Sequence, residues 1–145
     1  MTYYNKTVSY EIAKKLSNYN IKSENGFYTT EKTEDMNEGI FLYSEDARFV
    51  DGVIPAPTYG EVFDHFSEMG IIITLIPFHT FALLGNVGYT WEISYPLMEG
   101  SLITITEESE FIKSPSEKGF GGSFCLIADD AIKRVIKHQR INNEN

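Results

Sequence analysis

The sequence predicts an α+β protein, with an antiparallel sheet and about three helices packed mainly on one face of that sheet. Two observations lead to this prediction, one of spacing and one of composition. Apolar residues recur at helical spacing near the start, the middle and the end of the chain, and shorter segments between them are rich in aromatic and β-branched residues. Because strands and helices do not alternate regularly, as they do in a parallel sheet, we expect antiparallel pairing.

Three segments are predicted helices. The first spans residues 9–18. The second begins at a capping box formed by Thr58 and Glu61 and ends at Gly70, since glycine suits the left-handed residue that follows a helix. The third spans residues 123–139, with acidic residues early and basic residues late, an order that suits the helix dipole.

The predicted strands are shorter. They cover residues 27–30, 39–43, 71–76, 89–95 and 101–106. The strand 71–76 is apolar on both faces, so we expect it to be central in the sheet. Asp51 and Gly52 separate two apolar pairs and predict a hairpin turn, because glycine accepts a positive φ. Pro55 and Pro57 then end any strand pairing, since proline has no amide hydrogen.

The composition fits one folded domain. The chain has 145 residues, 42% hydrophobic and 14% aromatic, which is enough apolar material for an ordinary core. We expect a single domain over residues 1–145, with a flexible loop at 114–122 and a frayed tail at 141–145. The start lacks an apolar signal segment and no apolar run is long enough to cross a bilayer, so we expect a cytoplasmic protein.

The charge is strongly acidic. The formal net charge is -9, from 12 Lys and Arg against 21 Asp and Glu. Such a chain repels phosphate backbones, which disfavours nucleic acid as a partner, and it suits a basic protein. We therefore expect a protein partner and no membrane partner; a homo-oligomer is also compatible with the sequence.

Candidate metal ligands lie on the second predicted helix. Glu61 and His65 are spaced i, i+4 and share its polar side with Asp64 and Glu68. A metal site needs at least one further ligand from elsewhere in the chain. The preferred interpretation is a solvated acidic face with one histidine, and no cofactor is expected.

Two further candidates lie at the start of the last predicted helix. Gly121, Gly122 and Ser123 precede it, and free amides at a helix start can bind a phosphate or carboxylate. The wider context of a nucleotide loop is missing, so a hinge with a serine cap is preferred. Cys125, the single cysteine, excludes an intrachain disulfide and a cysteine-based zinc site. It could act as a nucleophile beside a histidine, but a small buried residue is the preferred interpretation.

Aromatic and basic rows supply the remaining candidates. Tyr89, Trp91 and Tyr95 share one face of a predicted strand. Such a row can bind bases or a protein, or it can be core beneath a helix, which is the preferred interpretation. The cations of the last helix are expected to be solvated on so acidic a chain; they are Lys133, Lys137 and Arg140.

Several pieces of the sequence resemble one family. Ala56-Pro57-Thr58 opens a helix that contains Phe66 and precedes Gly70-Ile71-Ile72; Tyr89 to Ile93 lies in the next strand; Asp130-Ala131-Ile132 and Val135 lie in the last helix; Val8 to Leu16 lies in the first. Together they resemble a family of small uncharacterised proteins from gut bacteria and their phages or prophages. The chain departs from that family at 67–69, which is less basic, and at the insertion 114–122. The resemblance implies a mobile-element origin and supplies no catalytic residues.

These observations favour a non-enzymatic accessory or protein-interaction protein of the phage or mobile-element type. An alternative is an acidic inhibitor of a basic, nucleic-acid-handling protein. The third possibility is a small enzyme that uses Cys125 or His65. No catalytic residue is assigned.

Overall fold

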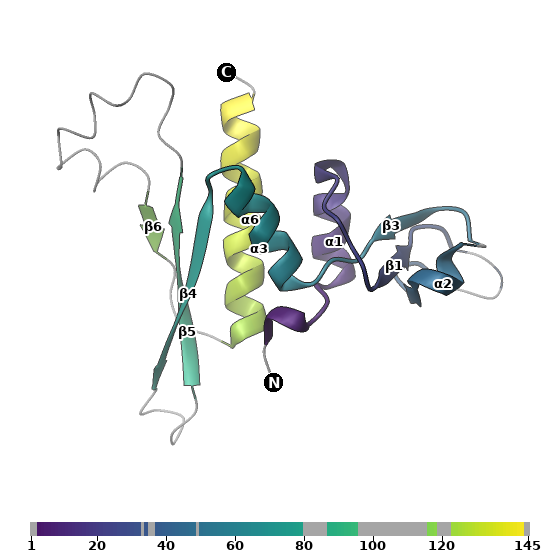
Figure 1. The fold of residues 1–145 in the computed structure, drawn as a ribbon, viewed down its shortest axis with the longest axis horizontal. Helices are drawn as coiled ribbons and strands as arrows, with labels where there is room; N and C mark the ends of the chain where they lie inside the picture. Colours follow the sequence, from purple (N-terminus) through teal and green to yellow (C-terminus); the bar gives the residue numbers. More distant parts are fainter. Residues whose placement is uncertain are drawn as a thin grey trace. The chain divides into compact units, whose positions relative to one another are not determined.

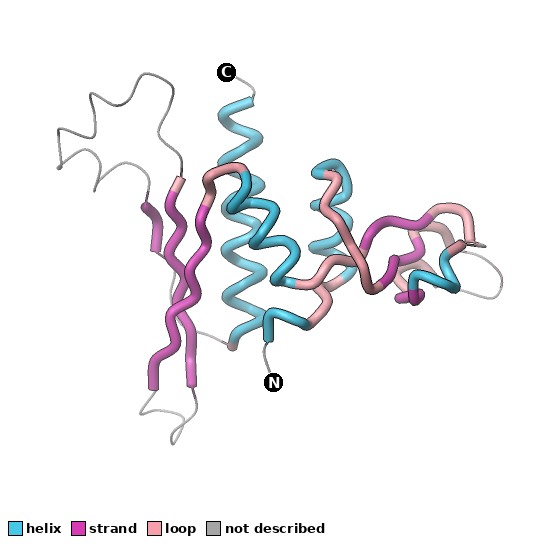
Figure 2. Tube along the Cα trace, viewed as in Figure 1, coloured by secondary structure: helices cyan, strands magenta, loops and turns pink. Residues whose placement is uncertain are grey.

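The computed structural model describes residues 3–32, 34, 37–48, 50–79, 87–95, 116–118 and 123–143. Their contacts divide the chain into two compact units. Unit 1 contains residues 1–65 and 139–145, and unit 2 contains residues 66–138. The helices and the antiparallel strands of both units confirm the α+β class (Figure 1; Figure 2). The single domain expected from the sequence stays a prediction.

Unit 1 contains a small antiparallel sheet with short helices. Its elements are η1 (Tyr3–Asn5), α1 (Tyr10–Leu16), η2 (Ser17–Tyr19), β1 (Gly26–Thr29), β2 (Phe41–Tyr43), α2 (Ser44–Ala47), β3 (Val53–Pro55) and the first part of α3 (Tyr59–Glu68). The strand order is β2-β1-β3, and Tyr28 in β1 lies opposite Phe41 on one side and Ile54 on the other. The apolar stripe of α1 is buried as the helical spacing predicts; it consists of Ile12, Ala13 and Leu16.

The turn at Asp51 and Gly52 does not form the predicted local hairpin. Gly52 has the expected positive φ, 66°. However, the residues before the turn form α2, and the Val50 amide donates to Ala47 O at 3.2 Å. None of the described residues directly before the turn forms a strand, and β3 pairs with β1. Pro55 is the last residue of β3, as predicted.

The capping box of α3 is confirmed. The Glu61 amide donates to Thr58 Oγ1 at 3.2 Å, and the Thr58 amide donates to Glu61 Oε1 at 2.9 Å. At the other end Gly70 has a φ of 85°, and the Ile71 amide donates to Phe66 O at 2.9 Å. Both ends of α3 are thus closed by the residues that the sequence indicates.

Unit 2 contains a second antiparallel sheet and a long helix. Its elements are β4 (Ile72–His79), β5 (Val87–Ser94), β6 (Ser116–Lys118) and most of α6 (Phe124–Asn143). The strand order is β4-β5-β6. The described residues thus form two three-stranded sheets where the sequence predicted one. Residues 116–118, within the predicted loop 114–122, form a strand, whereas the predicted strand 101–106 lies outside the described residues.

Among the described strands β4 lies at the end of this sheet, which differs from its predicted central position. Ile72 and Ile76 are 54% and 41% exposed, although the segment is apolar on both faces. Pro77 lies within β4 and has no amide hydrogen, which suits a strand at the end of a sheet better than a central one. The central strand is β5, which pairs with both neighbours.

α6 covers one face of β5. The helix begins directly after Ser123, as predicted, and extends past Gln139 to Asn143. Its apolar stripe is buried; the stripe consists of Phe124, Ile127, Ala128, Ala131, Ile132, Val135 and Ile136. Within the described part of the chain, no helix is both long and apolar enough to span a membrane.

Candidate functional site

The two candidate metal ligands have other roles in the structure. Glu61 caps α3 through Oε1, and its Oε2 accepts the Glu24 amide at 3.1 Å. The ring of His65 meets Tyr19 edge to face, with 6.4 Å between centroids. Among the described residues, no three His, Cys, Asp or Glu side chains are grouped so that they could hold a metal ion. Glu61 is therefore a structural residue of the helix start.

The aromatic row of β5 lies against α6. Trp91 is only 2% exposed, and its Nε1 donates to Asp130 Oδ2 at 2.7 Å. Tyr89 meets Phe124 edge to face, with 5.4 Å between centroids, and Tyr95 stacks on His138 at 3.8 Å. Bases or a partner protein cannot stack on a buried indole. The structure thus places Trp91 in the core of unit 2, beneath a helix.

Within unit 2, the described residues do not bring a histidine beside Cys125 at the start of α6. Cys125 is half-buried, and His138 lies more than three turns further along the same helix, about 20 Å away at 1.5 Å per residue. His65 belongs to unit 1, and the side chain of His79 is not described. Ser123 is exposed and its carbonyl accepts the Ile127 amide at 3.0 Å, whereas Gly121 and Gly122 lie outside the described residues.

The basic residues of α6 show the pattern expected of a solvated helix back. Lys133 and Lys137 are exposed, and the side chain of Arg140 is not described. Lys133 and Lys137 lie on the side of α6 away from the buried stripe.

A different group of aromatic side chains reaches the surface of unit 1. Tyr10 from α1, Tyr28 from β1, and Phe41 and Tyr43 from β2 follow one another in edge-to-face contact, with centroids 5.7, 5.6 and 5.3 Å apart. Edge-to-face pairs are favourable because the positive ring edge meets the negative ring face. We call these four residues the aromatic surface.

Strand register produces this group. Phe41 and Tyr43 are two residues apart and share a face of β2, and Tyr28 lies opposite Phe41 while Gly26 lies opposite Tyr43. A Cβ atom at Gly26 would collide with the carbonyl oxygen of Leu42 and lie 2.6 Å from the ring of Phe41. Glycine at this position therefore allows the Phe41 ring to lie close to β1.

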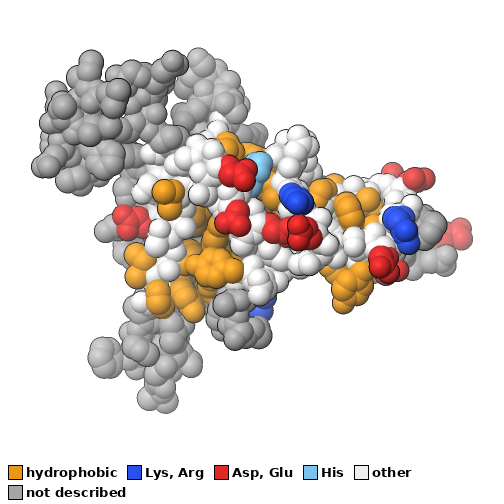
Figure 3. All heavy atoms as spheres, in the orientation of Figure 1, with side chains coloured by type: hydrophobic (Ala, Val, Ile, Leu, Met, Phe, Trp, Pro, Cys, Tyr) orange, Lys and Arg blue, Asp and Glu red, His pale blue; other side chains and the backbone are white. Residues whose placement is uncertain are grey.

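The end of the aromatic surface at Tyr43 is open to solvent. Tyr43 is 69% exposed, and the neighbouring Ile40 is 41% exposed, whereas Tyr28 and Phe41 are half-buried. Figure 3 shows hydrophobic side chains interspersed with acidic and basic ones over the part of unit 1 built from β1, β3 and α2. Large exposed aromatics set among polar residues are typical of binding surfaces.

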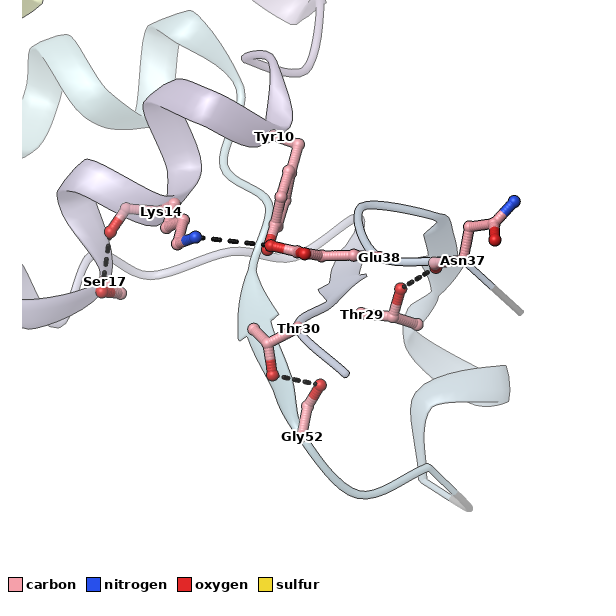
Figure 4. Close-up of polar contacts among 8 residues, drawn as sticks. All are labelled: Tyr10, Lys14, Ser17, Thr29, Thr30, Asn37, Glu38 and Gly52. Atoms are coloured by element: carbon pink, nitrogen blue, oxygen red, sulfur yellow. Dashed lines mark hydrogen bonds and ion pairs between the residues drawn. The ribbon is translucent and has the colours of Figure 1, made fainter. Parts of the chain in front are cut away.

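A polar contact holds the end of the aromatic surface at Tyr10. The Tyr10 hydroxyl donates to Glu38 Oε1 at 2.5 Å, and Lys14 Nζ donates to the same oxygen at 3.3 Å (Figure 4). The hydrogen bond from Tyr10, and then the contact with Lys14, lowers the pKa of Glu38. The same hydrogen bond raises the pKa of Tyr10. Tyr10 is thus held as a neutral donor rather than activated as a nucleophile.

Thr29 positions the segment that carries Glu38. Its hydroxyl donates to Asn37 O at 3.0 Å (Figure 4). The same hydroxyl accepts the Ile40 amide at 3.1 Å. Its backbone amide donates to Ile40 O at 3.0 Å, and its carbonyl accepts the Gly39 amide at 2.8 Å. Because Thr29 is 1% exposed, these bonds are shielded from water. The turn that presents Glu38 is therefore tied to β1.

The sequence signal for the aromatic surface is partial. Phe41 and Tyr43 have period-two spacing in the predicted strand 39–43, which indicates a shared face. The contacts with Tyr10 and Tyr28 have no local signal, because they depend on how α1, β1 and β2 come together.

Comparison of the chain with protein-family models, with curated proteins and with solved structures finds no match.

Proposed function

We propose that this protein is a non-enzymatic interaction protein that binds a basic protein partner through the aromatic surface. The observation that carries the proposal is Tyr43, which is 69% exposed at the end of a fixed row of rings. Tyrosine is enriched at the energetic centres of protein interfaces because it gives a large contact area at little entropic cost. The edge-to-face contact with Phe41 orients the Tyr43 ring before any partner binds.

The charges around this surface favour a cationic partner. Glu45 and Asp46 follow Tyr43 after Ser44 and are exposed, and Glu38 is exposed at the other end of the row. An arginine of a partner could stack on the Tyr43 ring while it pairs with Glu45 or Asp46. The net charge of -9 adds long-range attraction for a basic protein.

The resemblance to phage and prophage proteins suggests a setting for this activity. We propose that the protein belongs to a mobile element, acts in the cytoplasm, and serves as an accessory protein there. The acidic charge favours one form of this role, in which the protein covers the basic surface of a nucleic-acid-handling protein and inhibits it.

A defined probe tests the proposal. Isothermal titration with a hexa-arginine peptide should show binding that weakens with salt and is tighter than binding of hexa-lysine, because only guanidinium stacks well on a ring. Tyr43→Ser should weaken binding about fivefold, the equivalent of a single cation–π contact. The net charge is unchanged by this substitution, so non-specific attraction is held constant.

Leu126→Ser is the matched control. Leu126 is 67% exposed, like Tyr43, but it lies on α6 in unit 2. The control variant should bind the peptide as the unmodified protein does. Equal affinity of the unmodified protein and Tyr43→Ser, or equal affinity for the two peptides, would reject the aromatic surface as the binding site.

A further inference from the structure

The end strand β4 offers a second surface, separate from the aromatic surface. β4 spans eight residues, Ile72–His79, and one of its edges pairs along its whole length with β5. No other described strand pairs with its remaining edge. The backbone groups along such an edge can pair with a strand from another chain.

β4 has none of the charges that usually prevent such pairing. Edge strands are commonly protected by lysine or by other charged side chains. Charged residues make up 23% of this chain, yet the sequence of β4, Ile-Ile-Thr-Leu-Ile-Pro-Phe-His, contains no Asp, Glu, Lys or Arg. Pro77 restricts pairing only toward the end of the strand, so residues 72–76 are left without a blocking residue.

The exposed side chains of β4 lie on one face. Ile72, Thr74 and Ile76 alternate along the strand and are exposed, with 54% and 41% for the two isoleucines. The alternate residues Ile73 and Leu75 lie opposite Ile93 and Trp91, which are buried. The open face therefore presents two isoleucines with a threonine between them.

We propose that two copies of this chain pair through β4, antiparallel about a two-fold axis at Thr74. In this register Thr74 lies opposite Thr74 of the partner subunit, and Ile72 lies opposite Ile76 of the partner subunit. Both exposed isoleucines then gain an apolar cross-strand neighbour. The β4-β5-β6 sheets of the two copies then join into one continuous sheet of six strands.

The charge and the symmetry of β4 favour a second copy of this chain as the partner that pairs with its free edge. A basic partner gains nothing from a strand without carboxylates, whereas an uncharged strand is where two chains of charge -9 can approach most closely. The sequence around Thr74 is also self-complementary under a two-fold rotation, because isoleucine lies two residues to each side.

A cysteine cross-link tests the register. In a Cys125→Ala background, Thr74→Cys places two thiols on the proposed axis, where cross-strand Cβ atoms are about 5 Å apart. Copper–phenanthroline oxidation should convert most of this variant to a covalent dimer within minutes. Ser94→Cys is the matched control: it is exposed on β5, one strand away from the edge, and should cross-link far more slowly. Equal rates for the two variants would overturn the proposal.

Sedimentation equilibrium tests the association itself. Dimerisation should strengthen as salt screens the like charges, whereas binding of a basic peptide should weaken, so the two proposals fail independently. Ile72→Lys should raise the dimer dissociation constant at least about tenfold. Leu126→Lys, an exposed apolar residue on α6, should leave it unchanged. A monomer at every salt concentration, or no effect of Ile72→Lys, would overturn the proposal.

Discussion

Glu38 accepts two hydrogen bonds through a single carboxylate oxygen, from Tyr10 and from Lys14. The pKa of Glu38 is lowered in the fold, so its contribution to stability is present above its unfolded pKa and is lost as the pH falls through the folded pKa. The pKa of Tyr10 is raised, so its contribution is present below its ordinary value and is lost as the pH rises through the folded pKa. The contact is therefore complete at neutral pH.

Titration of the tyrosines by NMR checks this contact. In Glu38→Gln, the pKa of Tyr10 should fall back toward its ordinary value, because the charged acceptor is gone. The pKa of Tyr28 should stay raised, because burial is its cause and Glu38 plays no part. A Tyr10 pKa that does not move in Glu38→Gln would contradict the assigned cause.

Asp130 satisfies the one polar atom of a buried side chain. Trp91 is 2% exposed and its Nε1 donates to Asp130 Oδ2. Asp130→Ala should lower the free energy of unfolding by about 1–2 kcal/mol, because the indole N–H loses its acceptor. Asp130→Asn keeps an acceptor oxygen and should recover much of this loss. Urea unfolding followed by circular dichroism measures both variants, and equal stability of all three proteins would contradict the role of Asp130.

At the scale of the element, α3 depends on its first turn. Thr58 and Glu61 exchange two hydrogen bonds there, and Thr58 is 7% exposed. Thr58→Ala should lower the free energy of unfolding by about 1 kcal/mol, because the Glu61 amide loses its acceptor. Thr58→Ser retains a hydroxyl and should cost much less. If Thr58→Ser is as unstable as Thr58→Ala in urea unfolding, packing of the methyl group, and not capping, explains the effect.

Local patterns predicted the elements whose bonds are local. The capping box of α3 and the apolar stripe of α6 involve residues three or four positions apart, so the sequence indicates them directly. The pairing of β3 with β1 joins distant segments, and the position of β4 at the end of its sheet depends on the whole strand order. Such non-local contacts have no short-range signal, which is why a hairpin and a central strand were predicted instead.

The candidate site illustrates the same limit at the level of side chains. Trp91 and its neighbours are the most conspicuous aromatics in the sequence, yet helix α6 buries the indole. Phe41 and Tyr43 are less conspicuous, and their importance emerges only when β1 and α1 bring Tyr28 and Tyr10 beside them. Alternation alone cannot tell which face of a strand a helix will cover.

At the scale of the whole molecule, the net charge of -9 opposes the compact state. Exposed ion pairs such as Lys14–Glu38 and Lys22–Glu24 offset little of this repulsion. Adding sodium chloride from about 20 to 200 mM should therefore raise the midpoint of thermal unfolding, because the Debye length shortens. Differential scanning calorimetry checks this, and a midpoint that falls with salt would show that attractive pairs dominate.

The burial of Trp91 has a practical consequence. It is the chain's single tryptophan, so indole emission comes entirely from unit 2. Tyr10, Tyr28 and Tyr43 belong to unit 1, and their resonances report on that unit. Fluorescence of Trp91 and NMR resonances of these tyrosines thus report separately on unit 2 and unit 1, without any added dye. Loss of both signals along one curve would mark cooperative melting of the two units, and two curves would mark independent melting.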